Sequence, residues 1–186
     1  NMNIIDVDSV QMLWILRRMC DEGIYLDGRE IKNRPKLFLG AAASPFTLAP
    51  EMQAIRIRKK INAGAQFLQT NLVFDPDRLD PWLEQLDKLQ LLDKVFILVG
   101  ISPLKSLSLA RYLNEKIPGV TVPDRVMKRL ADAGDRFADE SIAITAETLA
   151  RLRTKKGISG VHIMPLGWEN ALPLILEKAA DETTDL

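Results

Sequence analysis

Two kinds of hydrophobic pattern alternate along the chain. The first is a short apolar run bounded by turn residues, which is typical of a buried strand. Four such runs occur, at Lys36–Ser44, Phe67–Phe74, Val95–Ser102 and Gly160–Pro165. Helical periodicity lies between them, and this alternation predicts parallel strands joined by crossover helices.

The helical segments carry recognisable start and stop signals. Asp8 is placed to cap a first helix that Gly23 would end, and Pro50 opens a second helix that ends at Gly64. Pro173 is expected in the first turn of the last helix.

The interval between the third and fourth runs is longer than one crossover needs. It holds at least three helical patterns. We therefore expect a helical insertion at about 104–158 within a single domain that spans residues 1–186, and such insertions often shape a site.

Composition narrows the class of protein. The 25 basic residues balance the 25 acidic ones, so there is no overall charge that would attract nucleic acid or an anionic membrane. No apolar run is long enough to span a membrane, and no signal peptide opens the chain. The single cysteine, Cys20, excludes an internal disulfide, and we expect a cytoplasmic protein.

Polar residues within the apolar segments are the candidates for a site. In the second helix, Gln53, Arg56 and Lys60 share one ridge, which could grip an anion or be a solvated stripe. In the second strand, alternation places Gln69, Asn71 and Val73 on one side and Leu68, Thr70 and Leu72 on the other. A buried amide there would contact a ligand or be satisfied by backbone.

His162, the only histidine, lies on the fourth strand. It could be a proton donor, a metal ligand or a packed core residue, and the last is the commonest role of a lone strand histidine. No second histidine or cysteine lies at ligand spacing, so we expect no metal.

Four motifs together resemble one enzyme family. "LGAAASP", "IRKKINAGAQFLQTNLVFD", "VGISPLKS" and "GVHIMPLGWEN" are similar, in order and spacing, to segments of the methylenetetrahydrofolate reductase family. The resemblance implies an α/β fold of the (β/α)8 TIM-barrel type. A complete barrel needs about 250 residues, so these four strands resemble its C-terminal half.

The resemblance also implies site residues. Ser44, Gln53, Arg56 and Lys60 match flavin-binding positions, and Asn71 matches a glutamine that hydrogen-bonds the pterin ring of the folate. The cofactor would be flavin adenine dinucleotide, with flavin mononucleotide left open by the small Ser44. A reduced nicotinamide or another donor would supply electrons.

Parts of the family pattern have no counterpart here. The catalytic acid and the Arg-Gly-Asp-type flavin motif are missing, so we assign no catalytic residue. Gly167 and Trp168 stand where the family has Asn-Arg. We interpret the abrupt start as a truncation, with the N-terminal half-barrel or a second copy as partner.

The expected function is flavin-dependent reduction of 5,10-methylenetetrahydrofolate to 5-methyltetrahydrofolate, a step of one-carbon metabolism and methionine biosynthesis. This fragment alone would be inactive. The alternative is a non-catalytic module that binds a pterin or a partner and lacks the catalytic half.

Overall fold

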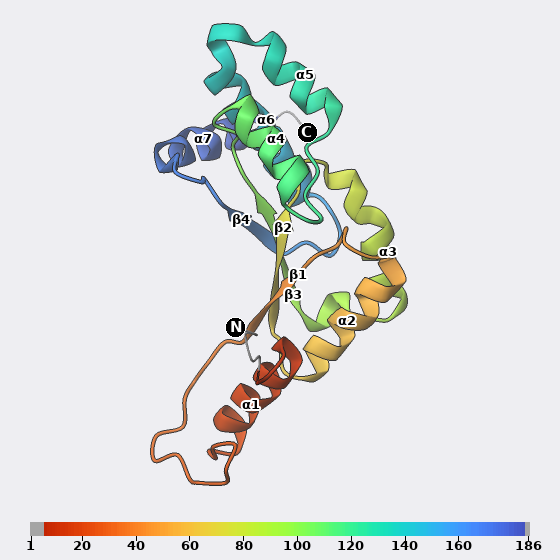
Figure 1. Cartoon of the computed structure of the whole chain (residues 1–186), viewed down its shortest axis with the longest axis vertical. Coiled ribbons are helices and arrows are strands. Elements are labelled where there is room, and N and C mark those ends of the chain that lie inside the picture. Colours follow the sequence, from red (N-terminus) through yellow and green to blue (C-terminus); the bar gives the residue numbers. More distant parts are fainter. Residues whose placement is uncertain (1–5, 185–186) are drawn as a thin grey trace.

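The computed structural model describes residues 6–184 as a four-stranded parallel sheet with helices (Figure 1). The strands are β1 (Gly40–Ala43), β2 (Phe67–Leu72), β3 (Phe96–Ile101) and β4 (Gly160–Ile163). The helices are α1 (Ser9–Asp21), α2 (Pro50–Asn62), α3 (Asp80–Lys88), α4 (Leu107–Lys116), α5 (Asp124–Asp132), α6 (Phe137–Arg153) and α7 (Leu172–Thr184). Short 3-10 turns are η1 (Pro76–Leu79), η2 (Leu92–Lys94), η3 (Gly134–Arg136) and η4 (Glu169–Ala171).

The predicted capping residues shape the helix ends. The Asp8 carboxylate accepts hydrogen bonds from the N–H groups of Val10 and Gln11, and the Gln11 side chain accepts one from the Asp8 N–H. Gly23, with a φ of 72°, follows the end of α1. Pro50 opens α2, and Pro173 lies in the first turn of α7, so these predictions are confirmed.

The strands lie in the order β1-β2-β3-β4, which makes β1 and β4 the edges of the sheet. β1 begins at Gly40 rather than at Lys36. Leu39 is still tied to β2, because its carbonyl accepts from the Gln66 N–H and its N–H donates to Gln66 Oε1. The Gln66 side chain therefore takes the place of a ladder bond, and the regular strand starts one residue later.

The main hydrophobic core lies between one face of the sheet and the helices. Leu68, Ile97 and Val99 point into it from the strands and are inaccessible to solvent. Helices α2, α3, α6 and α7 supply the other side of this core, which includes Ala54, Ile57, Trp82, Leu86, Leu149, Leu152 and Ile175. Ala54 and Ile57 thus lie on the buried face of α2.

The long segment between β3 and β4 forms a second cluster beyond the ends of β2 and β3. Leu72 and Phe74 from the second strand region meet Leu104, Leu113 and further apolar residues from α4, α5 and the connecting segment, which are Ala110, Val120, Val122, Val126 and Leu130. In Figure 1, α4 and α5 lie at one end of the molecule and α1 at the other. The cluster packs α4 and α5 against the carboxyl end of the sheet.

One part of the predicted alternation in β2 is wrong. Leu68 and Thr70 are buried and Gln69 and Asn71 are half-buried, as alternation predicts, but Val73 joins the main core and Leu72 joins the second cluster. A register shift between Gln69 and Leu72 causes this change. An extra residue in a strand exchanges the faces of all the residues that follow it.

None of the helices within residues 6–184 is long and apolar enough to cross a membrane.

Candidate functional site

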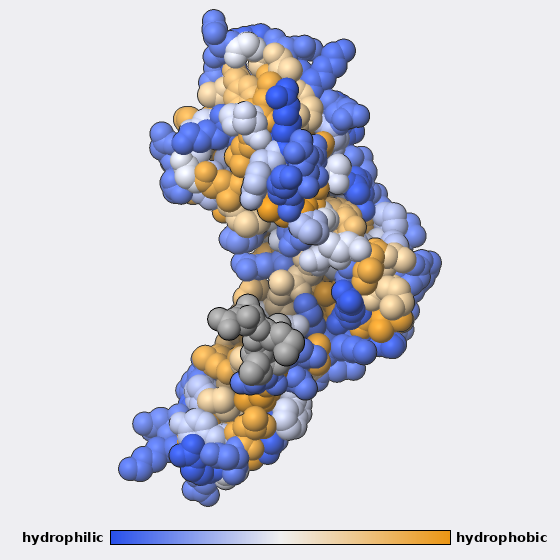
Figure 2. Space-filling view, in the orientation of Figure 1, coloured by the Kyte–Doolittle hydropathy of each residue, from blue (hydrophilic) through white to orange (hydrophobic). Residues whose placement is uncertain are grey.

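The face of the sheet opposite the main core is only partly covered. Register aligns Ala42, Gln69, Leu98 and Gly160 across the four strands. Ala42 is exposed, and Gln69 and Leu98 are half-buried. Figure 2 shows the outline of the molecule indented between its two ends, on the side of the sheet away from α2 and α3.

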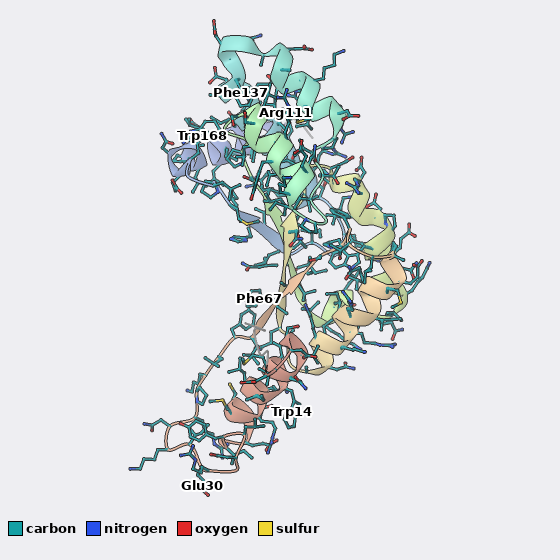
Figure 3. All side chains as sticks on the ribbon, viewed as in Figure 1. Trp14, Glu30, Phe67, Arg111, Phe137 and Trp168 are labelled. Atoms are coloured by element: carbon teal, nitrogen blue, oxygen red, sulfur yellow. The ribbon has the colours of Figure 1, made fainter. Side chains whose placement is uncertain are left out.

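Aromatic residues mark the amino-terminal end of this face. The rings of Phe38 and Phe67 stack with centroids 5.3 Å apart, and Phe38 lies 6.2 Å from Phe96. Phe67 projects away from α2 and α3 (Figure 3). Phe38 and Phe96 are each more than half exposed, and Gly40 leaves the space that the Phe67 ring occupies.

The carboxyl ends of the strands carry most of the polar candidates. In parallel β/α folds these ends gather at one edge, and ligands bind there. The loop after β1 holds Ser44, β2 ends near Asn71, and the loop after β3 holds Lys105. Together with the segment after β4, they form the candidate site.

Gln53 and Ser44 are joined through Thr47. The Gln53 Nε2 donates a 2.6 Å hydrogen bond to Thr47 Oγ1, and that hydroxyl donates a 3.2 Å bond to the Ser44 carbonyl. Gln53 is buried. Its amide therefore holds the loop after β1. The predicted ridge of Gln53, Arg56 and Lys60 is thus not exposed to solvent at Gln53.

Lys60 lies two turns further along α2, beside the open edge of β1. Its Nζ donates a 2.6 Å hydrogen bond to the Ala42 carbonyl. Burial lowers the pKa of Lys60, and the charge of nearby Arg56 lowers it further. Arg56 itself is exposed and forms no hydrogen bond or ion pair within residues 6–184. An anion between these two cations would relieve their repulsion.

Asn71 is half-buried at the carboxyl end of β2. Its Nδ2 lies 3.4 Å from the Pro118 carbonyl, in the turn after α4. Gly119 follows with a φ of 77°, and the same turn lies against Thr47. The segment between β3 and β4 thus brings a backbone turn over the ends of β1 and β2, close to the Asn71 amide.

His162 lies on β4 in register with Gly100 of β3 and is half-buried. Within residues 6–184, no group of three or more His, Cys, Asp or Glu residues is arranged to hold a metal. His162 belongs to the row of side chains on the partly covered face.

The loops after β3 and β4 contact each other through a lysine that we did not predict. Lys105 Nζ donates a 3.2 Å hydrogen bond to the Gly167 carbonyl. Leu166 and Gly167 both have positive φ, 51° and 83°. Trp168, one of the two residues that replace the family's Asn-Arg, packs at the margin of the main core. The "PLGW" sequence signals a turn, but its contact with Lys105 requires the fold.

Comparison with known proteins identifies the family. The family model described as methylenetetrahydrofolate reductase matches residues 42–180. The chain belongs to the methylenetetrahydrofolate reductase family. None of the curated proteins matches it.

A solved structure shows the same fold. It is an uncharacterised protein from Clostridium thermocellum that binds two copies of 5-methyl-5,6,7,8-tetrahydrofolic acid. The TM-score is 0.54 at 19% sequence identity, and the match covers 84% of this chain and 56% of that chain. The predicted family and the predicted partial barrel are therefore confirmed.

Membership of the methylenetetrahydrofolate reductase family indicates which side of a barrel the partly covered face belongs to. In a β/α barrel, one face of the sheet packs against helices and the other faces the barrel interior. By register, Gln69, Leu98 and His162 lie on the interior face. The matched residues 42–180 include Ser44, Gln53, Arg56, Lys60 and Asn71.

Proposed function

We propose that this chain contributes the folate- and flavin-binding wall of an enzyme that reduces 5,10-methylenetetrahydrofolate to 5-methyltetrahydrofolate. One observation carries the proposal: Asn71 lies at the carboxyl end of β2, within the residues that match the methylenetetrahydrofolate reductase family. The structural neighbour's binding of a methyltetrahydrofolate supports a folate as the ligand class.

Asn71 would orient the pterin. A side-chain amide both donates and accepts, as the edge of an aminopyrimidinone ring requires. Its present bond to the Pro118 carbonyl is long, at 3.4 Å, so a ligand can compete for Nδ2 at small cost. The Pro118 turn would then form one side of the pterin pocket.

Arg56 and Lys60 fit the phosphate groups of a flavin nucleotide. Guanidinium and ammonium groups are strong phosphate donors. Burial and the charge of nearby Arg56 lower the pKa of Lys60, and a bound phosphate would favour its charged form. Gln53 fits less well, because its amide is buried in the bond to Thr47. Flavin, when bound, would supply hydride chemistry, and the two cations would hold its phosphates at the edge of β1.

The interior face requires a second wall. The exposed rings of Phe38 and Phe96 and the two open strand edges are apolar and unpaired surfaces of the kind that proteins cover. A hollow of about 420 Å³ lies beside them, lined in part by Phe38, Gln66 and Phe96. We propose that four further β/α units of the same polypeptide complete the barrel, because an eight-stranded barrel needs them and the match covers only 56% of the structural neighbour's chain.

The test is spectroscopic. Protein purified from its host, with the whole polypeptide intact, should show a flavin absorbance that a reduced nicotinamide or a ferredoxin-type donor bleaches and that 5,10-methylenetetrahydrofolate restores. In Lys60→Ala, flavin occupancy should fall, because a charge-assisted bond contributes about 1.5–3 kcal/mol. Lys59→Ala, on the neighbouring exposed position, is the matched control.

A colourless protein that still binds folate would favour the non-catalytic module over the enzyme. Equal flavin occupancy in Lys60→Ala and Lys59→Ala would contradict the assignment of the phosphate site.

A further inference from the structure

The second strand contains a bulge directly beside the proposed pterin contact. Gln69 pairs with Leu98 and Leu72 pairs with Gly100, so three steps along β2 match two steps along β3. The extra residue lies within the Thr70–Asn71 pair. Bulges of this kind often redirect a side chain near a functional site.

The Thr70 hydroxyl occupies the place of the missing ladder bond. Thr70 Oγ1 accepts a 2.9 Å hydrogen bond from the Gly100 N–H and donates a 2.7 Å bond to the Asn71 carbonyl. Thr70 is only 4% exposed. One buried hydroxyl therefore bonds a backbone donor of β3 and a backbone acceptor of β2 at the bulge.

Gly100 completes the arrangement. A Cβ on this residue would lie 2.7 Å from the Thr70 carbonyl oxygen and 2.9 Å from the Asn71 carbonyl oxygen. The two carbonyls approach this closely only because residue 100 has no side chain. The ladder resumes at once, where the Val73 N–H donates to the Gly100 carbonyl at 2.7 Å.

We propose that Thr70 is a positioning residue, whose hydroxyl fixes the bulge and so directs the Asn71 amide toward the pterin beside the Pro118 turn. The proposal rests on the proposed folate-binding function. Its mechanism is local: the hydroxyl holds the Asn71 carbonyl, and this fixes the backbone from which the Asn71 side chain departs.

The experiment compares 5-methyltetrahydrofolate binding by calorimetry in the whole protein and its variants. Thr70→Val keeps the shape of the side chain but removes both hydrogen bonds, and it should weaken binding roughly five- to tenfold. Thr70→Ser should stay within about twofold of the wild type. Thr145→Val is the matched control, because Thr145 is equally buried and bonds a helix carbonyl of α6.

A double-mutant cycle separates positioning from general support of the fold. If Thr70 acts through Asn71, Thr70→Val should change the affinity of an Asn71→Ala protein by less than about twofold. An equal loss in both backgrounds would overturn the proposal, as would unchanged affinity in Thr70→Val. Should Thr70→Val not fold, Thr70→Ala replaces it, since it leaves room for a water at the Gly100 N–H.

Failure of the proposed function would be recognised separately. If the wild type binds no folate, the Asn71 side-chain amide resonances and the hydrogen exchange of the Gly100 N–H still report on the bulge. A change of both in Thr70→Val, with neither changed in Thr145→Val, would support the positioning role. No change in either would overturn it.

Discussion

The two faces of this sheet are built from the same strands but carry different chemistry. On the helix-facing side, Leu68 and Ile97 are completely buried. On the interior side, their chain neighbours Gln69 and Leu98 are half-buried, and Ala42 is exposed. One face is a finished hydrophobic core, whereas the other is the interior of a barrel that this chain completes only in part.

This difference shows that strand alternation divides the side chains into two sets, one that stabilises the fold and one that is available to a ligand. Residues that hold the fold point one way, and residues available to a ligand point the other way. The bulge at Thr70 and Asn71 changes which face of the sheet the following residues of β2 occupy. Mutations on the two faces should therefore have different consequences.

Two leucines give the largest expected contrast. Leu68→Ala would open a cavity in the main core and should cost about 2–5 kcal/mol of the free energy of unfolding. Leu98 lies on the interior face, next in sequence to Ile97, the register partner of Leu68. Leu98→Ala should cost at most about 1.5 kcal/mol of the free energy of unfolding, because its side chain is half-buried. Urea denaturation of both variants measures the difference, and equal losses would break the comparison of the two faces.

Two glycines test the bulge itself. Gly100→Ala places a methyl group against two backbone carbonyl oxygens and should destabilise the protein by about 1–3 kcal/mol. Gly160→Ala is the control, since its nearest contact is the flexible Leu98 side chain at 3.3 Å. Its effect on thermal unfolding should stay within about 1 kcal/mol. The reverse order of stabilities would contradict the close approach at Gly100.

Sequence reasoning predicted most of the fold because its signals are local. The capping Asp8, the opening Pro50 and the alternation at Leu68–Asn71 each depend on neighbours within a few residues. The four strands and their parallel direction followed from such signals. The exchange of Leu72 and Val73 did not, because a bulge depends on what lies opposite in β3.

The candidate site was less predictable for the same reason. Helical spacing placed Gln53 on a ridge with Lys60, but only the fold shows that Gln53 is buried against Thr47. Lys105 meets the Gly167 carbonyl across 62 residues of sequence. Contacts of this kind have no periodicity that a sequence could display.

The aromatic end of the interior face should matter for assembly more than for folding. Phe96 is 57% exposed, so Phe96→Ser should change the stability of the isolated 186 residues by no more than about 0.5 kcal/mol. It should weaken their association with the complementary half-barrel by at least about tenfold, because an interface aromatic would be lost. Light scattering of these 186 residues mixed with the complementary half-barrel measures the association. A 20.9 kDa species that stays monomeric and soluble and does not associate would contradict the proposed closure, and a symmetric dimer would assign it to a second copy.

The smallest effect concerns an ion pair remote from both faces. A hydrogen bond from Arg151 lowers the pKa of Asp77 below its ordinary value of 3.8. The pair therefore stabilises the protein above about pH 4, and this contribution is lost as the pH falls through the lowered pKa. Asp77→Asn should cost at most about 0.5 kcal/mol at pH 7 and nothing in stronger acid. A difference that persists or grows in acid would contradict this assignment.

The most direct test of the proposed folate site is 5-methyltetrahydrofolate binding to the whole protein and to Asn71→Leu, measured by calorimetry. The wild type should bind, and the variant should bind roughly ten- to a hundredfold more weakly, with flavin and melting temperature retained. Equal affinity in the two proteins would contradict the claim that the interior face of this sheet presents Asn71 to the pterin. Loss of the fold in Asn71→Leu would also contradict it, because Asn71 would then be a structural amide.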